Sequence, residues 1–252
     1  MDRDKLIEYI NKTLGLKEDQ DPWLFNGLQV IGKEKVLKIA LGVSPNMDFF
    51  EKAASWGADM IILHHGLLGP KGKRVNQVMK KRLKTLFDYN ITLLTYHLYL
   101  DKHESLGNNA EIIRLLGGKK RKEFGYQDKL YWGYEGKFLE GLKTEELLKR
   151  CQKLCGFKVK AFKYGPKKIK KFGVVSGGGP YLISEAIDRN LDAYLTGEAR
   201  ESTEAEAKEA GLNFIYLGHY NSEKFGVLAL GKFLKRKFPQ LEFKFFDVPN
   251  SL

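Results

Sequence analysis

Apolar runs of about four residues recur along the chain, and several of them are followed closely by a histidine. Residues 60–63 precede His64 and His65, while residues 91–94 and 214–217 precede His97 and His219. A short apolar run bounded by polar residues is typical of a buried β-strand. The pattern therefore predicts that four of the five histidines lie at the ends of buried strands.

Two segments of the chain show a similar order of predicted strands and helices. Residues 39–44 resemble residues 172–176, and each run is followed by a helical stretch and a second apolar run. His97 is separated from His219 by the same spacing that separates Asp101 from Glu223. We therefore predict an α/β fold of two related, interlinked and pseudo-duplicated units, with mixed sheets flanked by helices. Chance similarity between two ordinary α/β crossovers is the alternative.

A polar, glycine-bearing stretch at 117–125 marks the expected boundary between the units, because it follows a predicted helix and precedes an alternating segment. Residues 1–125 are expected to form the first α/β unit, completed by the C-terminal segment 220–252. Residues 126–219 are expected to form the second unit.

Composition indicates the general class of the protein. The chain has 252 residues, of which 43% are hydrophobic, and this is typical of a globular protein with a sizeable core. No run approaches the roughly 18 apolar residues of a membrane span. We expect a soluble, cytoplasmic protein without a membrane partner.

The two cysteines, Cys151 and Cys155, are four residues apart in a predicted helix and so share one of its faces. Two thiols at this spacing supply only half of a tetrahedral zinc site. The pattern favours packing residues over a metal or redox pair.

The formal net charge is +12, and lysines cluster at 119–122, 167–171 and 232–237. Such patches favour phosphates or nucleic acid, but lysine- and glutamate-rich surfaces also occur on thermostable proteins as solvated faces. We expect only weak, sequence-independent nucleic-acid binding, because neither a recognition helix nor a stacking platform is evident.

The residues at the predicted strand ends are of the types that bind metal ions. The first unit offers His64, His65, His97 and Asp101, and the second offers His219 and Glu223, with Glu198 at the place equivalent to His65. Imidazole nitrogen and carboxylate oxygen bind zinc, iron, manganese or cobalt. These side chains exceed the needs of one tetrahedral site, whereas two ions about 3.5–4 Å apart, bridged by a carboxylate, would use them and leave positions for water.

Other arrangements are less consistent with the sequence. A histidine at a strand end can also cap a carbonyl group or fill a gap in the packing. The chain has no Gly-x-Ser-x-Gly elbow, Walker loop or dinucleotide fingerprint. The segment 176–180 is glycine-rich and could cradle an anion, but a plain glycine turn is the simpler interpretation.

Taken together, these motifs resemble the NIF-three-like proteins, a ring-forming family with a dinuclear metal centre whose members are called GTP cyclohydrolase 1 type 2 homologues. The resemblance runs nearly end to end. It is carried by 21–23, 26–30, 64–66, 97–101, 106–109, 196–198, 218–220 and Glu223.

The resemblance implies two divalent ions per chain, which would be zinc, iron or manganese. It implies that His64 and Asp101 bind one ion, that His65 and His219 bind the other, and that Glu223 bridges both. His97, His103 and Glu198 would lie near the metals. The resemblance also implies a toroidal homohexamer.

The leading functional hypothesis is a metal-dependent hydrolase, in which His97 or Glu198 moves the proton. Its small-molecule substrate would be nucleotide-like, or a cyclic amide or phosphoester. A non-catalytic metal-handling or partner-binding ring is one alternative. A nucleic-acid-binding ring that uses the lysine patches is another.

Overall fold

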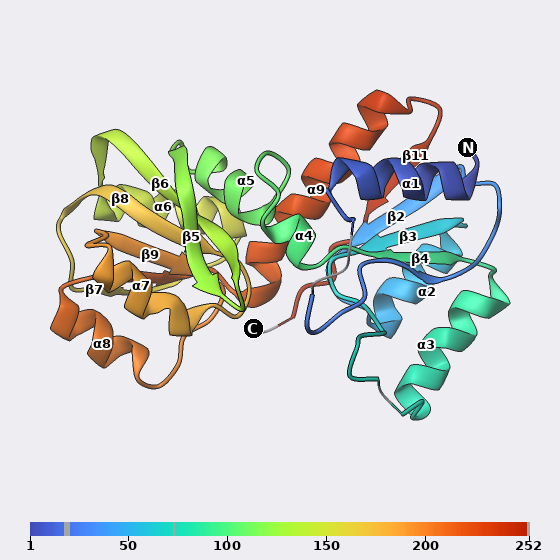
Figure 1. The fold of residues 1–252 in the computed structure, drawn as a ribbon, viewed down its shortest axis with the longest axis horizontal. Helices are drawn as coiled ribbons and strands as arrows, with labels where there is room; N and C mark the ends of the chain where they lie inside the picture. The colour runs from blue at the N-terminus through green and yellow to red at the C-terminus, as the bar shows by residue number, and fades with distance from the viewer. Residues whose placement is uncertain (18–20, 73, 251–252) are drawn as a thin grey trace. The chain divides into compact units, whose positions relative to one another are not determined.

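The computed structural model describes residues 1–17, 21–72 and 74–250, and the chain divides into two compact units (Figure 1). Unit 1 comprises Met1–Leu100 and Val227–Val248. Unit 2 comprises Asp101–Gly226 and the residues after Val248. Each unit contains one mixed β-sheet, so the predicted α/β fold with two mixed sheets is confirmed.

Unit 1 has a five-stranded sheet in the order β1-β4-β3-β2-β11. Its centre is three parallel strands that pair in sequence order. The outer strand β11 runs parallel to β2, whereas β1 runs antiparallel to β4. The strands are β1 (Gly27–Val30), β2 (Lys38–Gly42), β3 (Met60–Leu63), β4 (Thr92–Thr95) and β11 (Glu242–Phe245).

The helices of unit 1 are α1 (Arg3–Thr13), α2 (Met47–Ser55) and α3 (Gln77–Asp88). Both α2 and α3 begin after an asparagine, Asn46 or Asn76, whose side chain accepts a hydrogen bond from a backbone N–H of the first turn. Their apolar faces pack on the sheet, where Phe50 and Met79 join Ile61 in one buried cluster. Burial of these faces is what holds the short helices in place.

Unit 2 has a six-stranded sheet in the order β5-β6-β8-β9-β10-β7. Three parallel strands again form its centre, and antiparallel strands flank them on both sides. The strands are β5 (Lys119–Gln127), β6 (Leu130–Lys143), β7 (Lys160–Lys163), β8 (Lys168–Val175), β9 (Ala193–Thr196) and β10 (Asn213–Tyr216).

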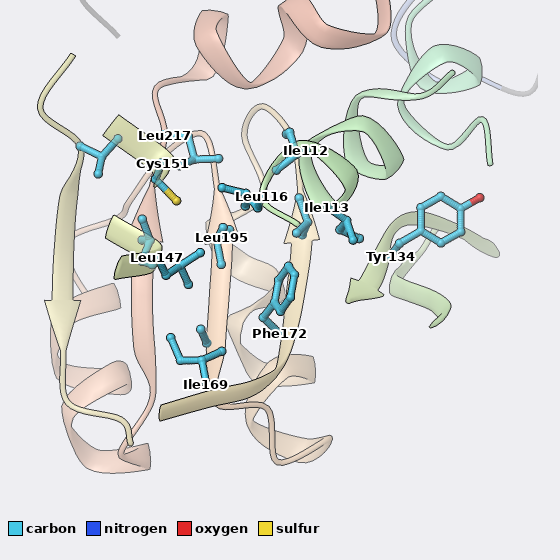
Figure 2. Close-up of a cluster of buried hydrophobic side chains, with 14 of the residues drawn as sticks. Ile112, Ile113, Leu116, Tyr134, Leu147, Cys151, Ile169, Phe172, Leu195 and Leu217 are labelled. Carbon is cyan, nitrogen blue, oxygen red and sulfur yellow. The ribbon is translucent and has the colours of Figure 1, made fainter. Parts of the chain in front are cut away.

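One face of this sheet is covered by α5 (Asn108–Leu115) and α6 (Thr144–Cys155). Figure 2 shows Ile112 of α5 and Cys151 of α6 in the cluster that Phe172 and Leu195 of the sheet complete. Cys151 and Cys155 are both buried in this cluster, which confirms that they are packing residues.

Strand alternation turns Tyr194 and Phe214 to the opposite face, where their rings contact each other. The remaining helices of unit 2 are the 3-10 turn Pro180–Leu182, α7 (Ile183–Asp188) and α8 (Thr203–Ala210). Among the residues that the structure describes, no helix is long and apolar enough to cross a membrane.

Two helices pass from one unit to the other. The short helix α4 (Leu98–Asp101) follows β4 and leads to α5, which packs in unit 2. The long helix α9 (His219–Lys237) begins in unit 2 and ends in unit 1, where β11 joins the sheet. The units are therefore interlinked, as the sequence predicted.

The centres of the two sheets share one topology. Met60 of β3 pairs with Ile39 and Thr92, and Ala193 of β9 pairs with Phe172 and Asn213. An aspartate precedes each middle strand and accepts hydrogen bonds from two successive backbone N–H groups. These are Asp59, which binds residues 37 and 38, and Asp192, which binds residues 170 and 171.

The register also refines the predicted correspondence between the histidines. Tyr96 donates its backbone N–H to Leu63, and Leu217 donates to Thr196 in the same way. His97 is therefore equivalent to Gly218, and His219 follows one residue later. Gly218 has a φ of 83°, a conformation that glycine adopts readily.

Candidate metal centre

In unit 1, three histidines converge at the carboxyl ends of neighbouring parallel strands. His64 and His65 follow β3, and His97 follows β4. The ring centroids of His64 and His97 are 5.1 Å apart, and those of His65 and His97 are 5.6 Å apart. One possible ligand atom from each ring lies within 4.8 Å of the others. This histidine cluster has the donors and the spacing to hold a divalent ion.

The hydrogen bonds of the cluster orient its rings for metal binding. Nδ1 of His64 lies 3.0 Å from the carbonyl oxygen of Tyr96, which can only accept a hydrogen bond. Nδ1 of His97 lies 2.8 Å from Oδ2 of Asp21, and Nδ1 of His65 lies 3.4 Å from the Ser44 hydroxyl. With its proton on Nδ1, an imidazole carries its lone pair on Nε2, and metal-binding histidines are commonly oriented in this way.

Asp21 is the buried partner of His97. Its carboxylate also accepts hydrogen bonds from the backbone N–H groups of Trp23 and Leu24 and from the Asn26 amide. Burial alone would raise the pKa of Asp21, but the hydrogen bond and charge of His97, together with the Trp23 amide, lower it to about 2. Sequence reasoning assigned no role to Asp21, because only its place in the family motif distinguished it.

In unit 2, Asp101 is a buried carboxylate whose position is fixed by two donors. The Asn108 amide and the Ser176 hydroxyl both donate to Oδ1, at 2.8 Å and 2.6 Å. Asn109 donates to the backbone carbonyl of Asp101 and accepts from the N–H of Ser176. These contacts orient the Asp101 side chain, as a metal-binding carboxylate requires.

His219 and Glu223 lie one turn apart in the first part of α9, so their side chains share a face. Nε2 of His219 is 3.2 Å from Oε1 of Glu223, and Nδ1 bonds to Glu198 from the segment after β9. Burial would lower the pKa of His219, but Glu223 and then Glu198 raise it to about 9. A divalent cation between such carboxylates can replace the proton of the imidazolium.

The glycine turn at 176–180 allows the backbone to approach this group. Gly177 has a φ of 66°, and a β-carbon there would overlap Oε1 of Glu223. Its N–H bonds to the Ser222 hydroxyl, and the N–H of Gly179 bonds to Thr196. Because these two amides have partners within the chain, they are not free to cradle an anion, which favours a plain turn.

His103 has a local role. Its Nδ1 accepts hydrogen bonds from the backbone N–H groups of Ser105 and Leu106, at 3.3 Å and 3.1 Å. The ring therefore stabilises the loop between α4 and α5.

Unit 1 thus places histidines, and unit 2 places His219 and Glu198, after the carboxyl ends of parallel strands, which are the usual positions for ligand sites in α/β proteins. The sequence matches the Duf34/NIF3 (NGG1p interacting factor 3) family over residues 1–251. The chain belongs to this family.

Curated relatives cover almost the whole chain. A GTP cyclohydrolase 1 type 2 homolog from Pyrococcus horikoshii is 37% identical and covers 100% of both chains. One from Archaeoglobus fulgidus is 35% identical over 98% of both. The crystal structure of TTHA1606 from Thermus thermophilus is 34% identical, covers 100% of both chains and superposes with a TM-score of 0.90. The similarity therefore extends from sequence to fold.

Proposed function

We propose that this protein is a metal-dependent hydrolase that holds two divalent ions through His64, His65, Asp101, His219 and Glu223. The observation that carries the proposal is the histidine cluster, where Nδ1 of all three rings bonds to another protein group. Imidazoles oriented in this way, such as those of His64 and His65, suit zinc, iron or manganese better than they suit packing alone. Membership of the family supports the full ligand set.

The carboxylates complete the donor set. Asp101 and Glu223 are buried, and each would otherwise hold negative charge in a site with little access to water. A pair of divalent ions would compensate this charge, polarise a substrate oxygen and lower the pKa of water toward neutrality. We propose that Glu223 bridges the ions, with His64 and Asp101 on one and His65 and His219 on the other.

His97 is our candidate for proton transfer. Asp21 holds its Nδ1–H, so Nε2 can accept a proton from a water molecule or return one to a leaving group. Glu198 bonds to Nδ1 of His219, which favours a role in orienting that ligand, beside the proton transfer expected from the sequence.

The substrate class follows from the relatives and from charge. Relatives carry the name GTP cyclohydrolase 1 type 2 homolog, and a chain with net charge +12 attracts phosphate groups. We propose a nucleotide-like substrate, or another cyclic amide or phosphoester. We also propose the ring-shaped homohexamer that the family resemblance implies, which light scattering would test.

The test is a substrate screen on protein loaded separately with zinc, iron(II) or manganese. Nucleotides including GTP, simple phosphoesters and cyclic amides would be offered to the wild type, to His97→Ala and to Gln29→Ala as the control, since the Gln29 side chain bonds to backbone groups. We expect metal-dependent turnover that falls at least about 100-fold in His97→Ala and is retained in Gln29→Ala. Stable metal binding without turnover of any class would contradict the hydrolase and favour a metal-handling protein.

A further inference from the structure

Three lysines form a row across strands β5, β6 and β8, beginning at the β5 edge of the unit 2 sheet. The strand register places Lys119 of β5 opposite Lys137 of β6, and Lys137 opposite Lys171 of β8. Residues directly opposite each other on antiparallel strands point to the same face, with their β-carbons about 5 Å apart. Like charges in this arrangement repel each other and destabilise the sheet unless an anion compensates them.

Among the described residues, the side chains of this lysine row have no ion-pair partner, whereas neighbouring cations do. Lys119 and Lys120 pair with β6 in one register, and the bulge in β5 falls after them, between Lys120 and Glu123. Lys120 bonds to the carbonyl of Glu104 and lies over the Tyr134 ring, and Lys122 is 3.8 Å from Glu135. The fold thus selects one lysine from that run and combines it with two that are distant in sequence.

The same face continues along β6 to a pair of tyrosines. Because side chains alternate along a strand, Tyr131 and Lys137 lie on one side of β6. Tyr131 pairs with Tyr126 across the hairpin, and their ring centroids are 5.0 Å apart. Tyr126 is 55% exposed, so one aromatic ring is presented to solvent at this end of the face.

Arg189 lies between the tyrosines and the lysine row. Its guanidinium is 5.9 Å from the ring centroid of Tyr131 and 5.5 Å from that of Phe124. It also lies 3.9 Å from the buried carboxylate of Glu135, which Lys122 approaches as well. Tyr131, the paired charges of Arg189 and Glu135, and Lys137 therefore follow one another along about 20 Å of strand, the length of the six steps from Tyr131 to Lys137.

The chemistry of this face fits one class of ligand. A small anion needs a concave site that surrounds it, whereas Lys119 and Lys171 are exposed on a strip of sheet. An extended ligand that carries regularly spaced negative charges and flat rings would use both ends of the strip. An acidic protein would leave the tyrosine pair without a role, and a duplex would keep its bases stacked away from it.

We propose that this face binds single-stranded nucleic acid, with Lys119, Lys137 and Lys171 contacting phosphates and Tyr126 stacking on a base. Binding is independent of sequence, because none of these groups reads a base edge. This inference does not depend on the metal centre.

The test uses fluorescence anisotropy of the full-length protein with a labelled single-stranded DNA of about 16 nucleotides. A variant that replaces all three lysines of the row by alanine is compared with one that replaces Lys80, Lys81 and Lys232, three exposed lysines of unit 1. The two variants carry the same net charge. Thermal melts of both confirm that they fold.

Removal of three phosphate contacts should lower the slope of log affinity against log salt by about 2 in the row variant, and the unit 1 variant should keep the wild-type slope. Tyr126→Ala should weaken binding about tenfold, whereas Tyr126→Phe retains it. Equal loss in both lysine variants would overturn the proposal, as would a duplex or polyglutamate that competes as well as the single strand.

Discussion

The two units share a centre of three parallel strands, but different candidate ligands follow those strands. In unit 1, β3 and β4 lead to three imidazoles, and a buried carboxylate beside them, Asp21, is bonded to His97. In unit 2, the equivalent strands β9 and β10 lead to the imidazole of His219, which is bonded to Glu198 and Glu223.

The two groups of side chains differ in the charge that they can carry. Imidazoles can be buried together at modest cost when each ring has a hydrogen-bond partner, as the rings of unit 1 have. Buried carboxylates need a cation, and in unit 2 the His219 imidazolium serves as one. The two copies of the framework therefore end in chemically different groups, which are imidazoles in unit 1 and carboxylates around one imidazole in unit 2.

The largest expected effect is on metal occupancy, since the two halves should contribute unequally. Under our proposal Glu223→Gln removes the bridging charge and empties both positions, from about two ions per chain to nearly none. His64→Ala should empty chiefly one position. Elemental analysis of protein purified without chelator measures both.

Gln29→Ala provides a control in unit 1, because the partners of the Gln29 side chain in the described part of the chain are backbone groups and Gln29 is not a proposed ligand. It should keep both ions. Wild-type protein that holds no divalent metal would remove the basis of the comparison.

The second prediction compares two glycines whose backbone lies close to a side chain, Gly177 in unit 2 and Gly66 in unit 1. Gly177→Ala should cost about 3 kcal/mol of stability, because its φ of 66° strains any side chain and the new methyl overlaps Glu223. Gly66→Ala should cost only about 1 kcal/mol, since the atoms it meets belong to the Gln29 side chain, which can shift. Urea denaturation gives both values, and equal costs would show that the turn in unit 2 is not special.

The third prediction concerns the equivalent aspartates that precede the middle strands. Both accept two backbone N–H bonds, but Asp59 also pairs with Lys33 at 2.7 Å. Asp59→Ala should therefore cost about 2 kcal/mol and Asp192→Ala about 1 kcal/mol. Denaturation at pH 7 compares them, with Lys33→Ala as the control that should account for the difference.

The stability that the Asp59 side chain contributes should depend on pH. Burial alone would raise the pKa of Asp59, but Lys33 and the N–H groups of Lys38 and Leu37 lower it below its usual value. A lowered folded-state pKa stabilises the protein above about pH 4 and loses this contribution as the pH falls through the folded value. The gap between wild type and Asp59→Ala should narrow below pH 4, and a gap that widens there would be inconsistent with this assignment.

The smallest effect is expected in the core. Cys151 packs α6 on the sheet of unit 2, where α2 of unit 1 uses the smaller Ala53. Cys151→Ala should cost about 1 kcal/mol. Burial raises the pKa of Cys155 to about 12 and also raises that of Cys151, so neither thiol should react with an alkylating reagent at pH 8 in the folded protein. Rapid labelling of either would contradict the packing role.

Much of the framework could be predicted because apolar periodicity reports burial directly. The strands that end near His64, His97 and His219 were evident, since a short apolar run that stops at a polar residue has few other structural solutions. The structure confirms the two mixed sheets. The one-residue shift between His97 and His219 could not be predicted, because backbone register depends on hydrogen bonds between strands.

The candidate site shows the same limit. Residue type and strand-end position identified the histidines, but the partners of their Nδ1 atoms are contributed by distant segments, such as the loop that carries Asp21. Sequence also grouped the lysines of 119–122 together, whereas strand pairing places Lys119 beside Lys137, and Lys137 beside Lys171.

The sequence by itself determined which residues are buried in strands and helices, and which ones can bind metal, because those properties depend on side-chain chemistry and local periodicity. The tertiary structure decided which strands pair, in which register, and which nitrogen of each histidine is held by another group. It also decided that α9 begins in unit 2 and ends in unit 1. These choices depend on contacts between residues far apart in the chain, and no local pattern encodes them.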